Sequence, residues 1–312
     1  MSQKVIVVGA GTMGASLAQV YAQAEWNTVL YNRSEPGLER ARKLIAINQE
    51  TLVSEGLQTV EGARHVQDVI QMTTDKAAFA DADLVVENIV EDLVAKKTFW
   101  AEISALVPTT ALLATNTSGL HISDIAEAVV LPERFIGQHW FNPPHLIPLC
   151  ELVMGEKTSQ ETVETMRKLV LNLGKSPIVV KKDISGFVAN RLQFAMLREA
   201  LYIVNSGIST YEDVDTVLKA GLGLRYAALG PFGVTDFGGL DTFSHISDYL
   251  FSDLCNDKEG SAVMRNLVAE GKCGVKSGAG FYDYTGDKAQ EAIRHRDKMY
   301  IDLAKTLYFK EK

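Results

Sequence analysis

The sequence predicts an α/β protein: an N-terminal, doubly wound and mostly parallel sheet of the Rossmann type, followed by a smaller all-α C-terminal domain. Three observations lead to this fold class. A β-branched run meets a glycine-rich turn and a helical pattern at the N-terminus, strand and helix patterns then alternate, and beyond Asp183 the patterns are helical. Alternating strands and helices are typical of a parallel sheet with helices on both faces.

The N-terminal turn is the most specific of these features. The run Val5–Val8 leads directly into Gly9-Ala10-Gly11-Thr12-Met13-Gly14. Gly9 would make the turn, Gly11 would let the backbone approach a pyrophosphate, and Gly14 would let helix and strand pack closely. The N–H groups at the start of the helix, where Thr12 and Met13 stand, favour an anion. The stretch therefore predicts a dinucleotide site, with a ligand-free glycine turn as the alternative.

Later segments continue the alternation and then change character. Strand patterns occupy 28–31, 83–87, 111–115, 134–139 and the stretch from Pro177. Helical patterns occupy 36–56, the stretch from Asp92 and 158–174. Thr158 and Glu161 have the spacing of a capping box. One long helix is expected between Gly186 and Gly207. We place the boundary near residue 184, which gives a dinucleotide-binding domain (1–184) and a helical substrate and dimerisation domain (185–312).

Composition excludes several classes of protein. The chain has 312 residues, 46% of them hydrophobic, a net charge of −8 and three cysteines. The acidic balance argues against a nucleic-acid partner, and the cysteines fit neither a disulfide framework nor a metal site. No apolar run approaches the roughly 18 residues of a membrane span. We expect a soluble, cytoplasmic protein without a metal.

The end of the second strand bears on the choice of nicotinamide cofactor. An acidic residue that binds the ribose hydroxyls belongs there, but the chain has Asn32, Arg33 and Ser34. Asn, Arg and Ser can bind a 2′-phosphate, and Arg33 would face it. This favours NADP slightly over NAD; in the alternative, Arg33 is a solvated surface charge and Asn32 serves NAD.

Two polar residues follow predicted strands at the edge of the sheet where ligands bind. Ser118 follows the strand 111–115, and His139 ends the strand 134–139. Histidine side chains in general titrate near neutral pH, which suits a base for the hydroxyl proton during hydride transfer. Glu151 is a candidate to orient the imidazole, although the residues alone do not show that the two touch. The alternatives are a structural histidine and a helix-capping serine.

Taken together, the motifs carry a family resemblance. They are, in order, the glycine turn, Asn116-Thr117-Ser118, His139-Trp140-Phe141-Asn142-Pro143, Glu151, Gly186-Phe187-Val188-Ala189-Asn190-Arg191, Gly230-Pro231-Phe232 and Gly278-Ala279-Gly280-Phe281-Tyr282-Asp283-Tyr284. As a set, from about residue 4 to 284, they resemble the 3-hydroxyacyl-CoA dehydrogenase superfamily.

The resemblance implies a role for each matching position. His139 would be the base and Glu151 its carboxylate partner, while Ser118 and Asn190 would hydrogen-bond the reacting oxygen or its neighbouring carbonyl. Asn142 would help to order the site. Glu91, Lys96 and Asn116 match cofactor-side positions, and Asn32 stands where the family usually carries Asp. The helical domain is the dimerisation domain of this family, so a homodimer is expected.

Two departures point away from an acyl-CoA substrate. Where acyl-CoA enzymes carry lysines that meet the CoA phosphates, the segment Ile47–Gly56 has two acids and no lysine. The longer segment Gly221–Pro231 contains Arg225, which would clamp a free carboxylate bidentately or form an ordinary helix-end salt bridge. With Asn142-Pro143-Pro144, this form resembles the branch of L-gulonate 3-dehydrogenase and λ-crystallin, carnitine dehydrogenase and a pyridine-carboxylate dehydrogenase.

The sequence therefore favours an NAD(P)-dependent dehydrogenase that moves hydride between the nicotinamide and a hydroxyl, at position 3, of a small free hydroxy or oxo acid. The first alternative is a 3-hydroxyacyl-CoA or 3-hydroxybutyryl-CoA dehydrogenase. The second is a cofactor-binding protein that has lost turnover, against which the intact set of Ser118, His139, Glu151 and Asn190 argues.

Overall fold

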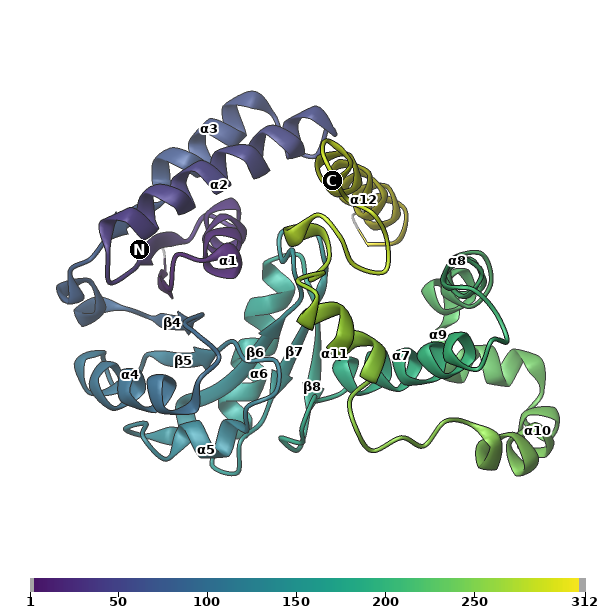
Figure 1. Cartoon of the computed structure of the whole chain (residues 1–312). Coiled ribbons are helices and arrows are strands. Elements are labelled where there is room, and N and C mark those ends of the chain that lie inside the picture. Colours follow the sequence, from purple (N-terminus) through teal and green to yellow (C-terminus); the bar gives the residue numbers. More distant parts are fainter. Residues whose placement is uncertain (1–2, 309–312) are drawn as a thin grey trace. The chain divides into compact units, whose positions relative to one another are not determined.

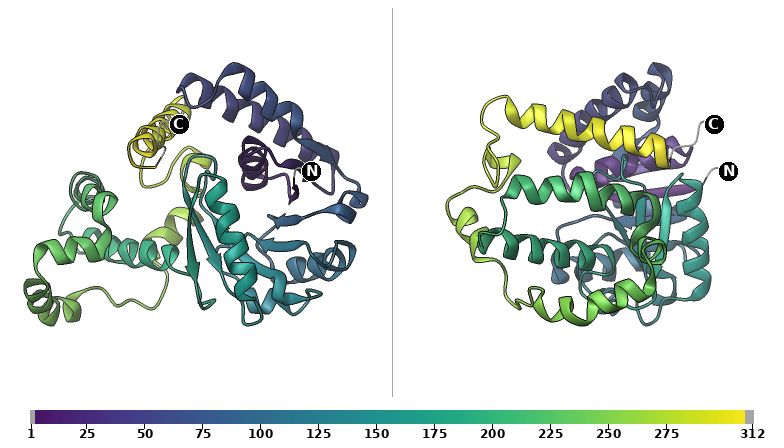
Figure 2. Two further views of the ribbon diagram at one scale, coloured as in Figure 1. Left: turned by 180° about the vertical axis from the view of Figure 1, so that it is seen from behind. Right: turned by 90° about the vertical axis from the view of Figure 1, so that its right-hand side faces the viewer.

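The computed structural model describes residues 3–308, which fall into two compact units (Figures 1 and 2). The first comprises the chain up to Val188 together with the stretch from Lys298 onward, and the second comprises Ala189–Asp297. The chain thus leaves the first unit once and re-enters it near the C-terminus.

An eight-stranded sheet organises the first unit. Its strands are β1 (Lys4–Val8), β2 (Asn27–Tyr31), β3 (Gln71–Thr73), β4 (Leu84–Glu87), β5 (Leu112–Thr115), β6 (Phe135–Trp140), β7 (Leu149–Val153) and β8 (Ser176–Val180). They lie in the order β3-β2-β1-β4-β5-β6-β7-β8. Neighbouring strands are parallel except β6 and β7, which are antiparallel. The predicted doubly wound, mostly parallel sheet is confirmed.

Helices pack on both faces of this sheet. They are α1 (Thr12–Gln23), α2 (Glu35–Ser54), α3 (Val60–Val69), α4 (Leu93–Leu106), α5 (Ile122–Ala126) and α6 (Gln160–Asn172), with short turns η1 (Lys76–Asp81) and η2 (Pro132–Arg134). In β1, Val5 and Val7 join one buried cluster with residues of α1, α2, α3 and α6, whereas Ile6 and Val8 join a second with residues of α4 and α5. Because strand side chains alternate, a strand covered on both faces has to be apolar throughout.

The expected capping box of α6 is wrong by one residue. The helix begins at Gln160, and the hydroxyl of Ser159 accepts a hydrogen bond from the Thr162 amide at 3.1 Å. The Thr158 hydroxyl instead donates to the Phe135 carbonyl at 2.7 Å, which ties the start of α6 to β6. The expected stop at Gly174 is confirmed, since this glycine follows the helix with φ +71°.

The second unit is helical. It contains α7 (Ala189–Asn205), α8 (Tyr211–Val217), a π-helical stretch η3 (Leu218–Leu222), α9 (Gly223–Gly238), α10 (Leu240–Asp253), α11 (Ala262–Ala269) and the 3-10 turn η4 (Val275–Ser277). The long helix starts at Ala189 rather than Gly186, because Gly186 and Phe187 have φ values of +74° and +47°. Such values belong to the left-handed region and do not continue a right-handed helix.

The last helix, α12 (Lys288–Leu307), joins the first unit from Lys298 onward. Ile301 is fully buried in a small cluster with Leu52 of α2 and Leu146. The Lys298 ammonium lies 3.6 Å from the Glu55 carboxylate, and the Lys305 ammonium donates to the Glu55 carbonyl. Among residues 3–308, no helix combines the length and the apolar character needed to cross a membrane.

Candidate active site

The glycine turn has the geometry of a dinucleotide site. A Cβ on Gly9 would lie 2.6 Å from the Asn88 carbonyl oxygen, and one on Gly14 would lie 1.8 Å from the Gly9 oxygen, so both must be glycine for packing reasons. A Cβ on Gly11 would meet nothing within 4 Å. Gly11 therefore leaves open space in front of α1, where no side chain caps the first turn formed by Thr12 and Met13. A pyrophosphate fits this space and these N–H groups.

Asn32 and Arg33 lie beside this turn, at the carboxyl end of β2. The Asn32 side-chain oxygen accepts from the Ala10 amide at 3.4 Å, and its nitrogen donates to the Ser34 carbonyl at 2.9 Å. Asn32 thus holds the glycine turn against the loop after β2. Arg33 is exposed.

His139 and Glu151 face each other across the antiparallel pair β6–β7. They are register partners, and the Nδ1 atom of His139 lies 2.7 Å from the Oε2 atom of Glu151. The other carboxylate oxygen, Oε1, accepts from the Val188 amide at 3.1 Å. Both side chains are buried. A carboxylate on Nδ1 leaves Nε2 with its lone pair, so the imidazole is set up as a proton acceptor at that atom.

Aromatic rings enclose the imidazole. The ring of Phe141 has its centroid 4.5 Å from that of His139, and the ring of Phe187 has its centroid 5.5 Å away. Excluding water in this way strengthens the electrostatic interaction between His139 and Glu151.

A buried polar network at the end of β4 was not predicted. Glu87 is fully buried; its Oε1 accepts from the Lys96 ammonium at 2.6 Å and the Ile89 amide at 2.7 Å, and its Oε2 accepts from the Thr115 hydroxyl at 2.6 Å and the Trp100 indole at 3.3 Å. The available signal was a glutamate at the end of an otherwise apolar strand. Every oxygen is satisfied, as a buried carboxylate requires.

This network supports the loop that carries Ser118. The enclosed Lys96 ammonium also donates to the Asn116 carbonyl at 3.0 Å. Glu91 accepts from the Thr117 hydroxyl at 2.6 Å and from the Ser118 amide at 2.8 Å. Of the predicted cofactor-side residues, Lys96 and Glu91 therefore act on the loop in this structure, and their contact with a cofactor stays a prediction.

Asn116 joins the ends of three strands. Its side chain donates to Asn88 at 2.8 Å after β4 and accepts from the Trp140 amide at 3.1 Å at the end of β6. The glycine turn, the Ser118 loop and His139 therefore lie along one edge of the sheet, at the carboxyl ends of β1, β5 and β6. This is the edge where ligands bind in open α/β sheets.

The remaining predicted residues are Asn142, Asn190 and Arg225. Asn142 is exposed in the loop after β6. Asn190 in α7 and Arg225 in α9 belong to the second unit. Arg225 is exposed, and within that unit it forms no ion pair with a described carboxylate, which disfavours the helix-end salt bridge. The roles of Asn142, Asn190 and Arg225 stay predictions.

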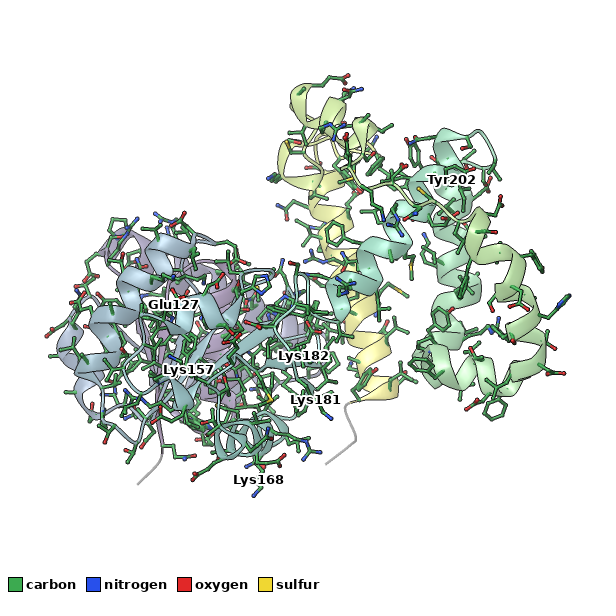
Figure 3. The ribbon with its side chains drawn as sticks, turned by 90° about the horizontal axis from the view of Figure 1, so that it is seen from below. Glu127, Lys157, Lys168, Lys181, Lys182 and Tyr202 are labelled. Carbon is green, nitrogen blue, oxygen red and sulfur yellow. The ribbon has the colours of Figure 1, made fainter. Side chains whose placement is uncertain are left out.

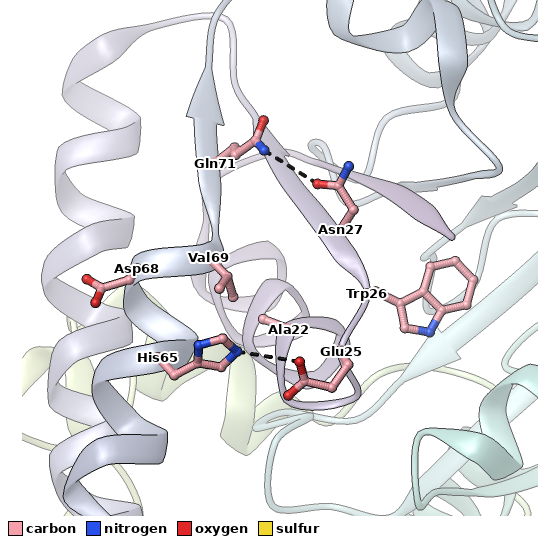
Figure 4. Close-up of a pocket in the computed structure, with 8 residues that line it drawn as sticks. All are labelled: Ala22, Glu25, Trp26, Asn27, His65, Asp68, Val69 and Gln71. Atoms are coloured by element: carbon pink, nitrogen blue, oxygen red, sulfur yellow. Dashed lines mark hydrogen bonds and ion pairs between the residues drawn. The ribbon is translucent and has the colours of Figure 1, made fainter. Parts of the chain in front are cut away.

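A surface pocket of about 370 Å³ lies away from these residues (Figure 4). It is lined by the end of α1, by α3 and by the first residues of β2 and β3, with His65 3.4 Å from Glu25 at its wall. These are the amino ends of the strands, opposite the glycine turn. The pocket is therefore not part of the candidate active site.

The fold and this site define a class of protein: a nicotinamide-dependent dehydrogenase with a histidine–carboxylate pair. Residues 4–184 match the family model described as 3-hydroxyacyl-CoA dehydrogenase, NAD binding domain, and residues 186–284 match its C-terminal domain. The chain belongs to the 3-hydroxyacyl-CoA dehydrogenase family and is an NAD-dependent oxidoreductase acting on CH–OH groups. The predicted resemblance is confirmed.

Individual relatives differ in their substrates. The 5-formyl-3-hydroxy-2-methylpyridine 4-carboxylate 5-dehydrogenase of Mesorhizobium japonicum is 33% identical over 312 residues, which is 100% of both chains. A crystal structure of that type of enzyme, described as an NAD+-dependent dismutase, has a TM-score of 0.91 at 34% identity and covers 100% of both chains. A probable 3-hydroxybutyryl-CoA dehydrogenase of Deinococcus radiodurans is 38% identical over 279 residues, 89% of this chain and 99% of the relative. The (S)-3-hydroxybutyryl-CoA dehydrogenase structure from Ralstonia eutropha has a TM-score of 0.75 at 31% identity, covering 92% of this chain and 100% of the other.

Proposed function

We propose that this protein oxidises a CH–OH group on a small free carboxylic acid by hydride transfer to NAD, with His139 as the general base. The observation that carries the proposal is the buried contact between His139 Nδ1 and Glu151 Oε2 at 2.7 Å. A base held in one tautomer, on the same sheet edge as the dinucleotide turn, suits the removal of a hydroxyl proton.

The reaction needs two transfers from the substrate. Bound at the glycine turn, NAD would supply the acceptor for the hydride that leaves the carbon. Nε2 of His139 takes the hydroxyl proton, so the C–O bond becomes a carbonyl, and Glu151 stabilises the imidazolium that results. Ser118 and Asn190 donate hydrogen bonds to the oxygen on which charge develops. The same steps act on a hydrated aldehyde, whose product is a carboxylic acid, and in reverse they reduce an oxo acid.

We propose NAD as the cofactor, with measurable activity on NADP that depends on Arg33. The NAD-binding family model and the NAD+-dependent relative support NAD. The exposed Arg33 and the absence of an acidic residue at position 32 leave room for a 2′-phosphate.

Arg225 favours a free acid over an acyl-CoA. No described carboxylate of the second unit pairs with it, so its guanidinium can bind the carboxylate of a substrate. The relative with 100% coverage is named for a pyridine carboxylate. The sequence suggested that the acids of α2 and the residue after it repel CoA phosphates. This argument is weaker in the structure, because Lys298 pairs with the Glu55 carboxylate and Lys305 donates to the Glu55 carbonyl. The alternative, a 3-hydroxybutyryl-CoA dehydrogenase, is supported by the relative at 38% identity.

We further propose a homodimer formed through the second unit. Its helices expose large apolar side chains, with exposed fractions between 57% and 86% for Phe194, Leu224, Phe232, Phe237, Tyr249 and Phe251. Apolar surface on this scale is typical of an obligate interface. Light scattering at micromolar concentration is expected to give twice the mass of the chain, and a monomer would contradict this.

A cytoplasmic location also stays a prediction.

The substrate proposal is tested by initial rates with NADH and NADPH. The panel contains acetoacetyl-CoA, free 3-oxo acids and a formylpyridine carboxylate. We expect turnover of free acids, a roughly tenfold or larger rise of KM in Arg225→Met, and no change in Lys219→Met, which removes an exposed charge nearby. Fast turnover of acetoacetyl-CoA alone would favour the alternative, and no turnover of any substrate would favour a non-catalytic cofactor-binding protein.

A further inference from the structure

The loop between β6 and β7, residues 141–148, connects the strand of His139 to the strand of Glu151. It carries Phe141, which packs on the imidazole, and Asn142, a candidate substrate contact. Inside the loop, the amides of Leu146 and Ile147 both donate to the Pro143 carbonyl, at 3.0 and 2.9 Å. A shift of this loop would therefore displace Phe141 from the imidazole and move Asn142 with it.

Lys175 reaches this loop from the turn between α6 and β8. Its side chain is nearly enclosed, with 7% of the residue exposed. The ammonium donates to the Pro144 carbonyl at 2.6 Å and to the Ile147 carbonyl at 3.2 Å. The amide of the next residue, Ser176, donates to the Pro148 carbonyl at 2.9 Å. The loop is thus held at three carbonyl oxygens by two consecutive residues.

Although its side chain is nearly enclosed, the lysine forms no ion pair with a carboxylate among the described residues. Lysine is rarely buried without such a partner. Burial lowers the pKa of Lys175 to about 8, while the neighbouring Cys150 thiol has its pKa raised by the same cause. An apolar side chain of similar length would avoid this cost of desolvation. What the lysine supplies in return is the donor for two carbonyl groups of the 141–148 loop.

We propose that Lys175 is a positioning residue, whose ammonium fixes the 141–148 loop in the conformation that the substrate meets. The inference rests on the proposed use of His139 in hydride transfer. It predicts that removing the ammonium loosens the loop and weakens substrate binding, while the dinucleotide turn at β1 is unaffected.

Hydrogen exchange tests the loop without reference to any activity. In Lys175→Met, the Leu146 and Ile147 amides are expected to exchange at least tenfold faster than in the unmodified protein, and Lys175→Gln, which keeps one donor group, is expected to be intermediate. Lys168→Met is the matched control, because Lys168 is exposed on α6 (Figure 3) and should change nothing. Unchanged exchange in Lys175→Met would overturn the proposal.

Kinetics with the substrate found above give the second readout. We expect Lys175→Met to raise the substrate KM about tenfold, to lower kcat less than threefold and to leave the KM for NADH unchanged. Equal loss of activity with both ligands, or failure of both variants to fold, would show a general structural role and contradict the proposal. If no substrate is turned over, the exchange experiment still decides on Lys175, so the two failures are distinguishable.

Discussion

At the scale of single residues, the site depends on buried polar side chains whose partners come from other elements of the first unit: α4 and β5 for Glu87, β6 for Glu151, and the 141–148 loop for Lys175. Glu87 accepts from the Lys96 ammonium, Glu151 accepts from the Val188 amide, and Lys175 donates to the Pro144 carbonyl. Burying such groups is costly unless they are hydrogen-bonded. Each therefore constrains the geometry around it.

Lys175 gives a pH dependence of stability with a definite sign. Its pKa is about 8 in the folded chain against 10.5 ordinarily, so the unfolded chain binds more protons between these values and stability rises with pH across that window. A lowering of this size corresponds to about 3 kcal/mol. Urea titrations give the difference in the free energy of unfolding between the unmodified protein and Lys175→Met. We expect this difference to increase, between pH 8 and 10.5, by an amount that approaches about 3 kcal/mol. A flat difference would show that burial does not lower this pKa.

At the scale of elements, the turn between β1 and α1 separates packing from ligand binding. Gly14→Ala places a Cβ 1.8 Å from the Gly9 oxygen, whereas Gly11→Ala places one in open space. We expect Gly14→Ala to lower Tm by several degrees because the backbone has to shift. Gly11→Ala should keep Tm and weaken NADH binding about tenfold, because its methyl group fills the space of the pyrophosphate. Calorimetry measures Tm, and NADH fluorescence measures the affinity for NADH. If Gly11→Ala and Gly14→Ala changed Tm equally and NADH affinity equally, the two glycines would not have separate roles.

Much of this fold follows from local sequence patterns. The β1 turn, β4 with α4, β5 and β6 were predicted, because an apolar strand or a capping residue such as Asp92 is recognisable from a few neighbouring residues. The strand β7 was not, and its antiparallel pairing is what brings Glu151 opposite His139. Register is set by partners distant in sequence, so the residues alone identify the pair but not its contact. Lys175 was missed because in a sequence it resembles an ordinary surface charge, and Glu87 because its place at the end of an apolar strand does not name its buried partners.

At the scale of the whole molecule, α12 ties the C-terminal end of the chain to the first unit. It follows residue 284, where the match to the family model ends. Its helical pattern did not reveal that the part from Lys298 onward packs against α2 and Leu146. An amphipathic pattern identifies an apolar face but not the surface that covers it.

This docking is testable with one buried and one exposed position of α12. Ile301 is fully buried, whereas Leu303 is 52% exposed. We expect Ile301→Asp to destabilise the chain by about 3 kcal/mol or more, since a carboxylate would be buried without a partner. Leu303→Asp should stay within about 0.5 kcal/mol. Chemical unfolding followed by tryptophan fluorescence gives both values, and equal stability of the two variants would show that the helix does not dock.

The central claim is that His139, oriented by Glu151, moves the proton during hydride transfer. Its most direct test is the pH profile of kcat for the unmodified protein, His139→Asn and Glu151→Gln, on the substrate identified above, with NADH binding measured in parallel. We predict that His139→Asn lowers kcat about 10²- to 10⁴-fold and removes the pH dependence of kcat, that Glu151→Gln lowers kcat by a smaller factor, and that NADH binds all three proteins equally. Unchanged kcat in His139→Asn would contradict the account, because the pair would then be structural.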